Sequence, residues 1–170
     1  PLQQLFTVDP IARRRKTSLD IGAHAAFHPS DLETLKSRLG PKAPDALADL
    51  VFELSSDISA LNAAIDLAGF AGRIVIGSWY GAAAAAVNLG GRFHRSRIRL
   101  VASQVSTLPP EFAARWNRTR RIETAWEMIR RCRPSRLITH AIPVDRAAEA
   151  YELLDRRPEE ALQIVFTYRQ

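Results

Sequence analysis

The residues of this sequence that could hold a ligand stand at the ends of short apolar runs. They are Asp9, Ser55, Gly77, Ser78, Ser103 and Gln104. If the runs are parallel strands, their carboxyl ends meet at one edge of a sheet, which is where open α/β sheets bind ligands. A carboxylate and hydroxyls there would hydrogen-bond a polar small molecule. A glycine would admit that molecule close to the backbone, because glycine has no Cβ.

Asp9 has the most specific chemistry of this set. It ends the run Leu5-Phe-Thr-Val8 and precedes a basic, helix-prone stretch at 11–16. In dinucleotide-binding domains, an acid at the tip of the second strand accepts hydrogen bonds from the adenosine ribose, which favours NAD over NADP. The arginines at 13–15 keep NADP as an alternative, since guanidinium groups pair well with phosphate. The other interpretation of Asp9 is an ordinary turn acid ahead of Pro10.

The apolar runs alternate with helical patterns. We predict strands at 5–9, 24–28, 49–54, 73–78 and 97–103, and helices at 11–20, 30–39 and 57–70. Strands separated by helices at this spacing indicate βα units and a parallel sheet. The runs Leu50-Val-Phe52 and Ile74-Val-Ile76 are continuous rather than alternating, which is typical of a sheet covered on both faces. Ser56 or Asp57 is expected to cap the third helix.

The Gly-rich phosphate loop of a dinucleotide-binding domain lies roughly 20 residues before the ribose acid. Only residues 1–8 precede Asp9. Either Asp9 is an ordinary strand-end acid, or the sequence is the back part of a nucleotide enzyme. On the second interpretation we expect an α/β fold with a Rossmann-type parallel sheet that lacks its first βα unit.

Pro109-Pro110 begins a second segment, so we predict domains at 1–108 and 109–170. A long helical pattern is followed by a strand at 137–142, a helix at about 146–155 capped by Asp145, and a terminal strand at 162–168. The apolar positions of the long helix are Phe112, Trp116, Ile122, Ala125, Trp126 and Ile129. We expect the two tryptophans to pack in a core or between domains. Stacking on nucleic-acid bases is the alternative.

Composition narrows the class of protein. The chain has 170 residues, 46% of them hydrophobic, which is enough to bury one core. It has no apolar run near 18 residues and no basic-then-apolar leader, so we expect neither a membrane span nor a signal peptide. Cys132 is the one cysteine, which fits a reducing cytoplasm. The net charge of +6 fits a solvated basic face, with nucleic acid or a phosphate-bearing small molecule as alternatives.

The side chains that could bind zinc are scattered. They are His24, His28, His94, His140 and Cys132. Catalytic zinc needs three converging protein ligands. His24 and His28 are four positions apart, but they bracket a predicted strand and do not share a helix face. We expect no metal bound by this chain.

Taken in order, the motifs resemble one enzyme family over about residues 5–168. They are the strand ending in Asp9 with its basic helix, Ala48-Asp-Leu-Val-Phe-Glu53, Gly72-Arg-Ile-Val-Ile-Gly77, and the tail Ile138-Thr-His-Ala-Ile-Pro-Val-Asp-Arg-Ala-Ala-Glu-Ala-Tyr-Glu-Leu-Leu154. This ordered set is similar to the C-terminal, cofactor-binding portion of zinc-type medium-chain alcohol dehydrogenases.

The resemblance implies a missing catalytic domain that holds the zinc ligands and on which the C-terminal tail packs. It implies hydride transfer between NAD, or NADP, and an alcohol or carbonyl substrate. The residues placed around the cofactor are Asp9, Arg14, Ser55, Gly77, Ser78, Ser103 and Gln104. Arg14 would lie along the adenosine ribose, and the last four would meet the nicotinamide and its carboxamide. We expect no catalytic residue in this chain, no turnover by the chain alone, and pairing of two copies as in the family.

Two other functions stay open on the sequence. One is a Rossmann-like binding or regulatory module without catalysis. The other is a basic nucleic-acid-binding domain, which a steep loss of nucleic-acid affinity with salt would support. We expect neither a nucleic-acid nor a membrane partner.

Overall fold

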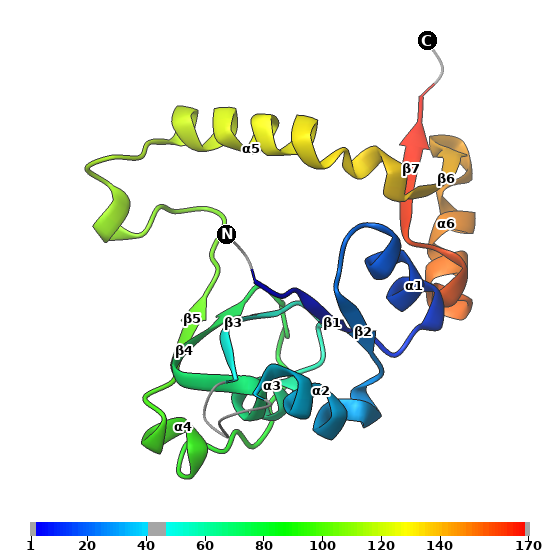
Figure 1. The fold of residues 1–170 in the computed structure, drawn as a ribbon. Helices are drawn as coiled ribbons and strands as arrows, with labels where there is room; N and C mark the ends of the chain where they lie inside the picture. Colours follow the sequence, from blue (N-terminus) through cyan, green and yellow to red (C-terminus); the bar gives the residue numbers. More distant parts are fainter. Residues whose placement is uncertain (1–2, 41–46, 169–170) are drawn as a thin grey trace. The chain divides into compact units, whose positions relative to one another are not determined.

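The structure is a computed structural model that describes residues 3–40 and 47–168. The chain divides into two compact units (Figure 1). The first consists of Pro1–Pro10 and Arg15–Val105, and the second of Ile11–Arg14 and Ser106–Gln170.

Strands and helices alternate through the first part of the chain. In order they are β1 (Phe6–Val8), α1 (Ala12–Asp20), β2 (Ala25–Phe27), α2 (Leu32–Leu39), β3 (Ala48–Glu53), α3 (Ala60–Leu67), β4 (Ala68–Ile76), α4 (Arg92–Arg95) and β5 (Arg99–Ala102). The pairings among the described strands are parallel, as expected where a helix connects consecutive strands. The predicted α/β class is confirmed.

The strands form two separate ladders. β1 pairs with β2, while β3 pairs with β4 and β4 with β5. No ladder joins β1 to β3 in the described residues, although Phe6 of β1 and Val51 of β3 pack against one buried cluster that includes Phe27 and Leu35. In the doubly wound fold, the first strand lies between the second and the fourth, which correspond to β1 and β3. The chain thus has a Rossmann-type sheet without its first βα unit, as predicted.

Helix α3 covers one face of the ladder β3–β4–β5. Leu61, Ala64 and Ile65 recur at helical spacing and are buried. Ile65 is 3% exposed and belongs to one cluster with Ile74 of β4, which is fully buried. Because burying one such side chain contributes about 1.5–3 kcal/mol, this cluster fixes the strands against the helix.

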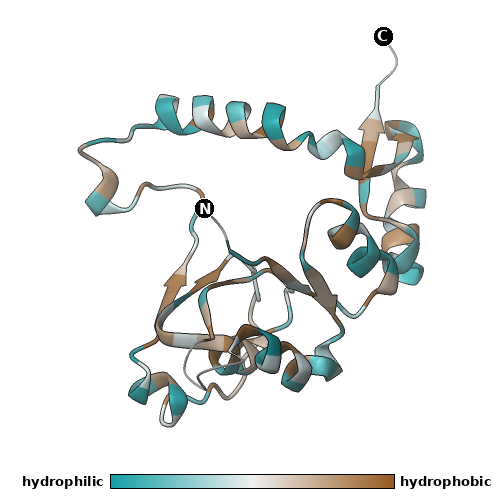
Figure 2. Ribbon diagram, in the orientation of Figure 1, coloured by the Kyte–Doolittle hydropathy of each residue, from teal (hydrophilic) through white to brown (hydrophobic). Residues whose placement is uncertain are grey.

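The opposite face of the same ladder carries exposed apolar side chains. Much of the ribbon of these strands is brown, hence hydrophobic, in Figure 2. Phe52 is 60% exposed, and Leu50 and Val101 are 38% and 42% exposed. The prediction of a sheet covered on both faces is therefore wrong for the described residues. A doubly wound sheet has helices on both faces, and the missing βα unit would carry one of them.

Helix α3 ends at Leu67, earlier than the predicted residue 70. Ala68 already belongs to β4 and pairs with Ala48, before a shift in register. A Cβ on Gly72 would lie 2.9 Å from the Gly69 carbonyl oxygen and 3.0 Å from that of Ala48. Glycine is therefore needed where this irregular strand passes close to its neighbour.

The second unit contains its own parallel pair of strands. Its main elements are α5 (Arg118–Cys132), β6 (Ile138–Pro143), α6 (Ala147–Arg156) and β7 (Gln163–Thr167). The predicted terminal strand, β7, pairs with β6, and Ala150 and Leu153 of α6 are buried. A short 3₁₀ turn at Val144–Arg146 precedes α6, so Asp145 lies inside that turn and does not cap the helix as predicted.

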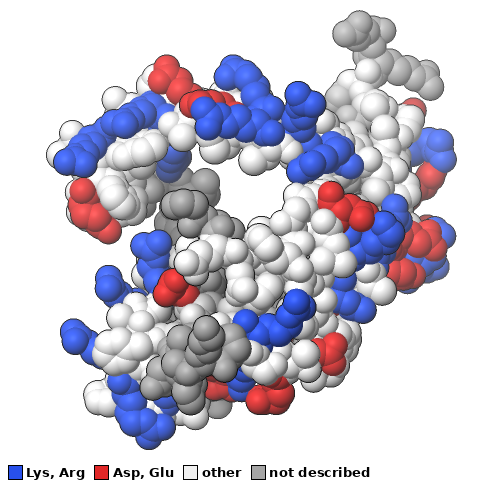
Figure 3. Space-filling view, in the orientation of Figure 1, with Lys and Arg blue, Asp and Glu red and all other residues white. Residues whose placement is uncertain are grey.

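Helix α5 has no buried residue among those described. Trp126 is 55% exposed, so it lies in no core of the described chain, and packing between domains stays a prediction. The Arg120 guanidinium stacks 4.6 Å from the centre of the Trp116 ring. Figure 3 shows basic side chains along this helix, namely Arg118, Arg120, Arg121, Arg130 and Arg131. No helix in the described part of the chain is long and apolar enough to span a membrane.

Candidate functional site

The carboxyl ends of β3, β4 and β5 lie side by side. Glu53, Ile76 and Ala102 occupy neighbouring positions in the ladders. The N–H of Gly77 donates to the Glu53 carbonyl oxygen at 3.0 Å, and the N–H of Ser103 donates to the Ile76 carbonyl oxygen at 2.8 Å. The predicted site residues that follow these three strands are therefore brought to one edge, the ligand edge of an open α/β sheet.

Glu53 is a buried carboxylate at this edge, only 4% exposed. Its Oε1 atom accepts hydrogen bonds from the Ser55 N–H at 2.7 Å and from the Ser55 hydroxyl. Its Oε2 atom accepts a hydrogen bond from the Tyr80 hydroxyl. Because a buried charge is costly unless it is hydrogen-bonded, these donors allow the carboxylate to remain ionised.

The pKa of Glu53 is lowered and the pKa of Tyr80 is raised. Burial raises the pKa of Glu53, but the hydrogen bonds from Ser55, Tyr80 and Ser78 together outweigh burial and hold that pKa below its ordinary value. Burial, followed by the hydrogen bond to the Glu53 carboxylate, raises the pKa of Tyr80 to about 12. At neutral pH the proton therefore stays on Tyr80, and the pair is a fixed donor and acceptor.

Ser56 joins the two loops through its backbone. Its φ of 61° is in the left-handed region, and its N–H donates to the Ser78 Oγ atom at 2.8 Å. The prediction that Ser56 caps the next helix is wrong, because α3 has Ser59 at its N-cap position. The turn before α3 is held by the Asp57 carboxylate, which accepts a hydrogen bond from the Ser59 N–H at 2.9 Å. Asp57, the other predicted cap, is not at the N-cap position either.

Ser55 and Gly77 both lie at the ligand edge, but they differ in which of their groups are accessible there. The Ser55 hydroxyl donates to Glu53 and accepts from the Asp57 N–H at 3.0 Å, so its hydrogen is already used inside the protein. Gly77 is exposed. A Cβ at this position would lie 2.6 Å from the Cδ2 atom of Leu54. The backbone at Gly77 is therefore accessible at the edge, and the contact of either residue with a cofactor stays a prediction.

Asp9 and Arg14, predicted to meet the ribose, belong to different units. Asp9 follows β1 and is half-buried. Its N–H donates to the Phe27 carbonyl oxygen at 3.1 Å, and its carbonyl oxygen accepts from Arg15 at 2.7 Å. The Arg14 guanidinium donates to the Pro158 carbonyl oxygen at 3.4 Å. The roles of Asp9 and Arg14 at a ribose stay predictions.

The histidines near β2 have local partners. His24 Nδ1 accepts from the Leu5 N–H at 3.0 Å, and His28 Nδ1 accepts from the Ser30 N–H at 3.2 Å. The described residues contain no group of three or more side chains that could hold a metal ion. They do not fit a zinc site.

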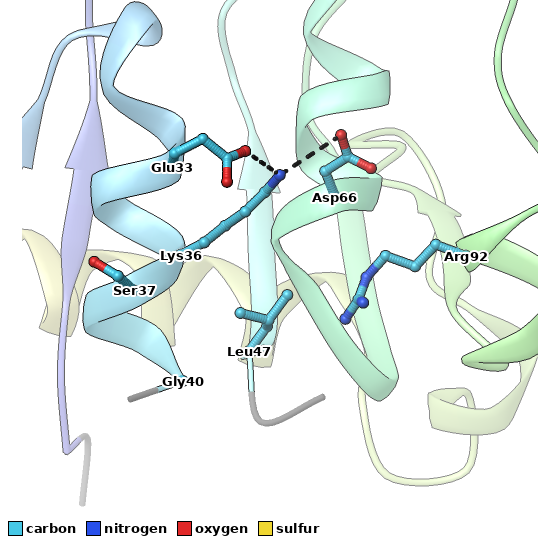
Figure 4. A pocket seen from close by; sticks show the side chains of 7 residues that line it. All are labelled: Glu33, Lys36, Ser37, Gly40, Leu47, Asp66 and Arg92. Carbon is cyan, nitrogen blue, oxygen red and sulfur yellow. Dashed lines mark hydrogen bonds and ion pairs between the residues drawn. The ribbon is translucent and has the colours of Figure 1, made fainter. Parts of the chain in front are cut away.

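A shallow polar pocket lies away from the ligand edge, between α2 and α3 (Figure 4). Its lining residues are Glu33, Lys36, Ser37, Gly40, Leu47, Asp66 and Arg92. The Lys36 ammonium lies 2.7 Å from Glu33 and 4.0 Å from Asp66, so its charge is neutralised within the pocket. Leu47 precedes β3, which places the pocket at the amino end of that strand, where ligands of α/β sheets do not bind.

No protein-family model matches the chain. Among curated proteins, the chain is 27% identical over 172 residues to D-guloside 3-dehydrogenase of Escherichia coli strain K12, and equally to the protein of that name from Shigella flexneri. The alignment covers 95% of this chain and 47% of the relative. The chain thus spans about half the length of the curated relatives it matches.

Solved structures match nearly the whole length of this chain. An alcohol dehydrogenase from Thermotoga maritima matches with a TM-score of 0.79, over 98% of this chain and 44% of that one. A short chain alcohol dehydrogenase from Escherichia coli CFT073, complexed with NADH, matches with a TM-score of 0.76, over 98% and 45%. Both are 18% identical to this chain. The chain has the fold of the C-terminal part of an alcohol dehydrogenase.

Within this dehydrogenase fold, the Glu53–Tyr80 pair is the feature that sequence reasoning missed. From the sequence, Glu53 is an acid at a strand tip, and Tyr80 lies 27 positions further on. One signal was available. Glu53 shares a strand face with Val51, which packs into the core, and the period of two places both side chains on the covered face. A carboxylate on the covered face of the sheet is stable only if buried hydrogen-bond donors contact it.

Proposed function

We propose that this chain is the cofactor-binding part of an NAD(P)-dependent oxidoreductase that transfers a hydride between the nicotinamide and an alcohol or carbonyl substrate. The observation that supports this most is the ladder arrangement, in which two parallel ladders share a core but lack the strand between them. The likeness in fold to an alcohol dehydrogenase that was solved with NADH supports a nicotinamide cofactor.

Seven residues are proposed to contact the cofactor; six of them follow the carboxyl ends of four strands, and Arg14 lies in α1. They are Asp9, Arg14, Ser55, Gly77, Ser78, Ser103 and Gln104. Asp9 would accept hydrogen bonds from the adenosine ribose and repel a 2′-phosphate, which makes NAD the preferred cofactor. Gly77 would let the nicotinamide approach the backbone. Every one of these residues binds or orients, and none of them takes part in the chemical step.

The catalytic centre is proposed to lie in a preceding portion of the protein, where zinc would polarise the substrate oxygen. This chain alone should therefore have no turnover. The proposed substrate is an alcohol or a carbonyl compound, and sugar derivatives belong in the first assay panel because the curated relative is a D-guloside 3-dehydrogenase. We further propose a cytoplasmic protein that pairs with a second copy and has no nucleic-acid or membrane partner.

The cofactor role is tested by titrating NADH into the chain and into Asp9→Ala. Binding should be weak without the phosphate loop, and Asp9→Ala should weaken it about tenfold or more, because a hydrogen bond to a charged group is lost. Asp20→Ala is the matched control, since Asp20 is an exposed acid paired with Lys16 at 2.7 Å. Equal affinity in the two variants, or no binding by the unaltered chain, would contradict the proposal.

The enzymatic role is tested separately from cofactor binding. The protein with its preceding sequence restored should reduce NAD with an alcohol of the panel, whereas the 170-residue chain should not. NADH binding without turnover in the longer protein would favour a non-catalytic binding or regulatory module instead.

A further inference from the structure

We propose that Tyr80 and Glu53 are positioning residues that join the loop after β3 to the loop after β4 and so hold the cofactor-facing edge in one arrangement. This inference rests on the proposed function and adds two residues to it. Neither is expected to touch the cofactor. They would act through Ser55 and Ser78, which lie beside them.

The geometry that carries the proposal is a closed set of contacts between the two loops. The Glu53 carboxylate, at the end of β3, holds Ser55 with one oxygen and the Tyr80 hydroxyl with the other. In the opposite direction, the Ser56 N–H donates to Ser78 Oγ at 2.8 Å. Each loop therefore supplies both a donor and an acceptor to the other.

The pair suits a static role better than proton transfer. The titratable groups that face the Tyr80 phenol are Glu53 and Asp57, and both carboxylates disfavour its ionisation. The Glu53 carboxylate is stabilised in its ionised form by its donors. A general acid or base works best with a pKa near the working pH, whereas this phenol and carboxyl are far from it in opposite directions. The hydrogen bond between them is therefore permanent at neutral pH.

Loss of the hydrogen bond between Tyr80 and Glu53 would lower the fraction of molecules whose two loops are arranged to bind the cofactor. An apparent dissociation constant rises in inverse proportion to the fraction of molecules that are competent to bind. A hydrogen bond to a buried charge is strong enough to change that fraction about fivefold or more when it is removed. The aromatic ring of Tyr80 need not change, so Tyr80→Phe isolates the hydroxyl.

The experiment compares Tyr80→Phe with Tyr151→Phe, whose side chain is 68% exposed on α6. Amide hydrogen exchange is measured first, without cofactor, followed by an NADH titration. Tyr80→Phe should speed exchange at Ser55 and Ser56 and raise the NADH dissociation constant about fivefold or more. Tyr151→Phe should change neither. Glu53→Gln keeps the side-chain volume, but it removes the charge and replaces one of the two accepting oxygens with an N–H₂ donor, so it should raise the NADH dissociation constant at least as much as Tyr80→Phe.

The two proposals can fail separately. Unchanged exchange at Ser55 and Ser56 in Tyr80→Phe would overturn the joining of the loops, even if NADH binds. Faster exchange with an unchanged NADH dissociation constant would overturn the positioning role. No NADH binding by the unaltered chain would contradict the proposed function, and the joining of the loops would then stand or fall on the exchange data.

Discussion

The N–H of Gly77 donates to the carbonyl oxygen of Glu53 at 3.0 Å, just beyond the last paired residues of β3 and β4. This bond extends the ladder by one step and fixes where the loop after β4 departs. The residues that follow, from Gly77 to Tyr80, therefore start from a defined position beside the Glu53 carboxylate. The ends of β3 and β4 therefore set the position of the ligand edge, and the side chains of the loops that follow them line it.

Gly77→Val should weaken NADH binding while it leaves the free energy of unfolding almost unchanged. The new side chain would meet the Cδ2 atom of Leu54, 2.6 Å from the position of a Cβ, but Leu54 is 69% exposed and can turn outward. We expect a change in the free energy of unfolding below about 1 kcal/mol. NADH affinity should fall about tenfold or more, because the edge becomes covered.

Gly90→Val is the matched control for Gly77→Val. The nearest atom to a Cβ at Gly90 is Asn88 Oδ1, at 3.8 Å, and Gly90 is not at the ligand edge. This variant should keep the NADH affinity of the unaltered chain. Equal affinity for NADH in Gly77→Val would sink the assignment of Gly77 to the cofactor.

Ser56→Gly should stabilise the chain. The φ of 61° at Ser56 places a side-chain-bearing residue in the left-handed region, which costs about 1–2 kcal/mol for most residues. Part of that gain is offset by the greater freedom of glycine in the unfolded chain, so we expect about 0.5–1 kcal/mol in urea unfolding. Ser59→Gly, at a φ of −65°, should give no gain. A loss of stability in Ser56→Gly would contradict this account of the turn.

Tyr80 should make stability fall at alkaline pH. Its pKa is raised to about 12 by burial and then by the hydrogen bond to Glu53, whereas an unfolded tyrosine titrates near 10. The folded state therefore holds the proton more tightly, and the resulting stability is complete below about pH 10 and is lost as the pH rises toward 12. The slope of unfolding free energy against pH in this range should be less steep in Tyr80→Phe. Identical slopes would contradict the raised pKa of the Tyr80 phenol in the folded state.

The two faces of the ladder β3–β4–β5 should respond differently to truncation. Ile74→Ala removes a fully buried side chain and should cost about 2–5 kcal/mol in the free energy of unfolding. Phe52→Ala removes a larger side chain that is 60% exposed and should cost less than about 1 kcal/mol. Urea unfolding of the two variants measures the difference. Equal costs would mean that the second face is covered in solution.

Much of the fold could be predicted from the sequence because the strands are short, apolar and regularly separated by helical patterns. The runs at Leu50-Val-Phe52 and Ile74-Val-Ile76 fall inside β3 and β4. The end of α3 could not be predicted, since Ala68 continues the helical period while its backbone pairs with Ala48. Helix α4 has four residues, too few for a period to appear.

The candidate site was predicted where it depends on strand ends and missed where it depends on tertiary contacts. Ser55, Gly77 and Ser103 follow strands, and parallel pairing brings strand ends together. The burial of Glu53 depends on donors from a loop that is distant in sequence, and no local pattern encodes it. Serine is a common helix cap, which is why Ser56 was predicted to be one. Its backbone is in the left-handed region, and the residue type does not predict this conformation.

The most direct test of the account is to map NADH onto the amide resonances of the 170-residue chain. Chemical shift mapping detects weak binding, which suits a domain without its phosphate loop. We expect shifts that gather at the residues after β1, β3, β4 and β5, including Asp9, Gly77 and Ser103. Shifts centred on the pocket at Lys36 and Asp66, or no shifts at saturating NADH, would contradict it.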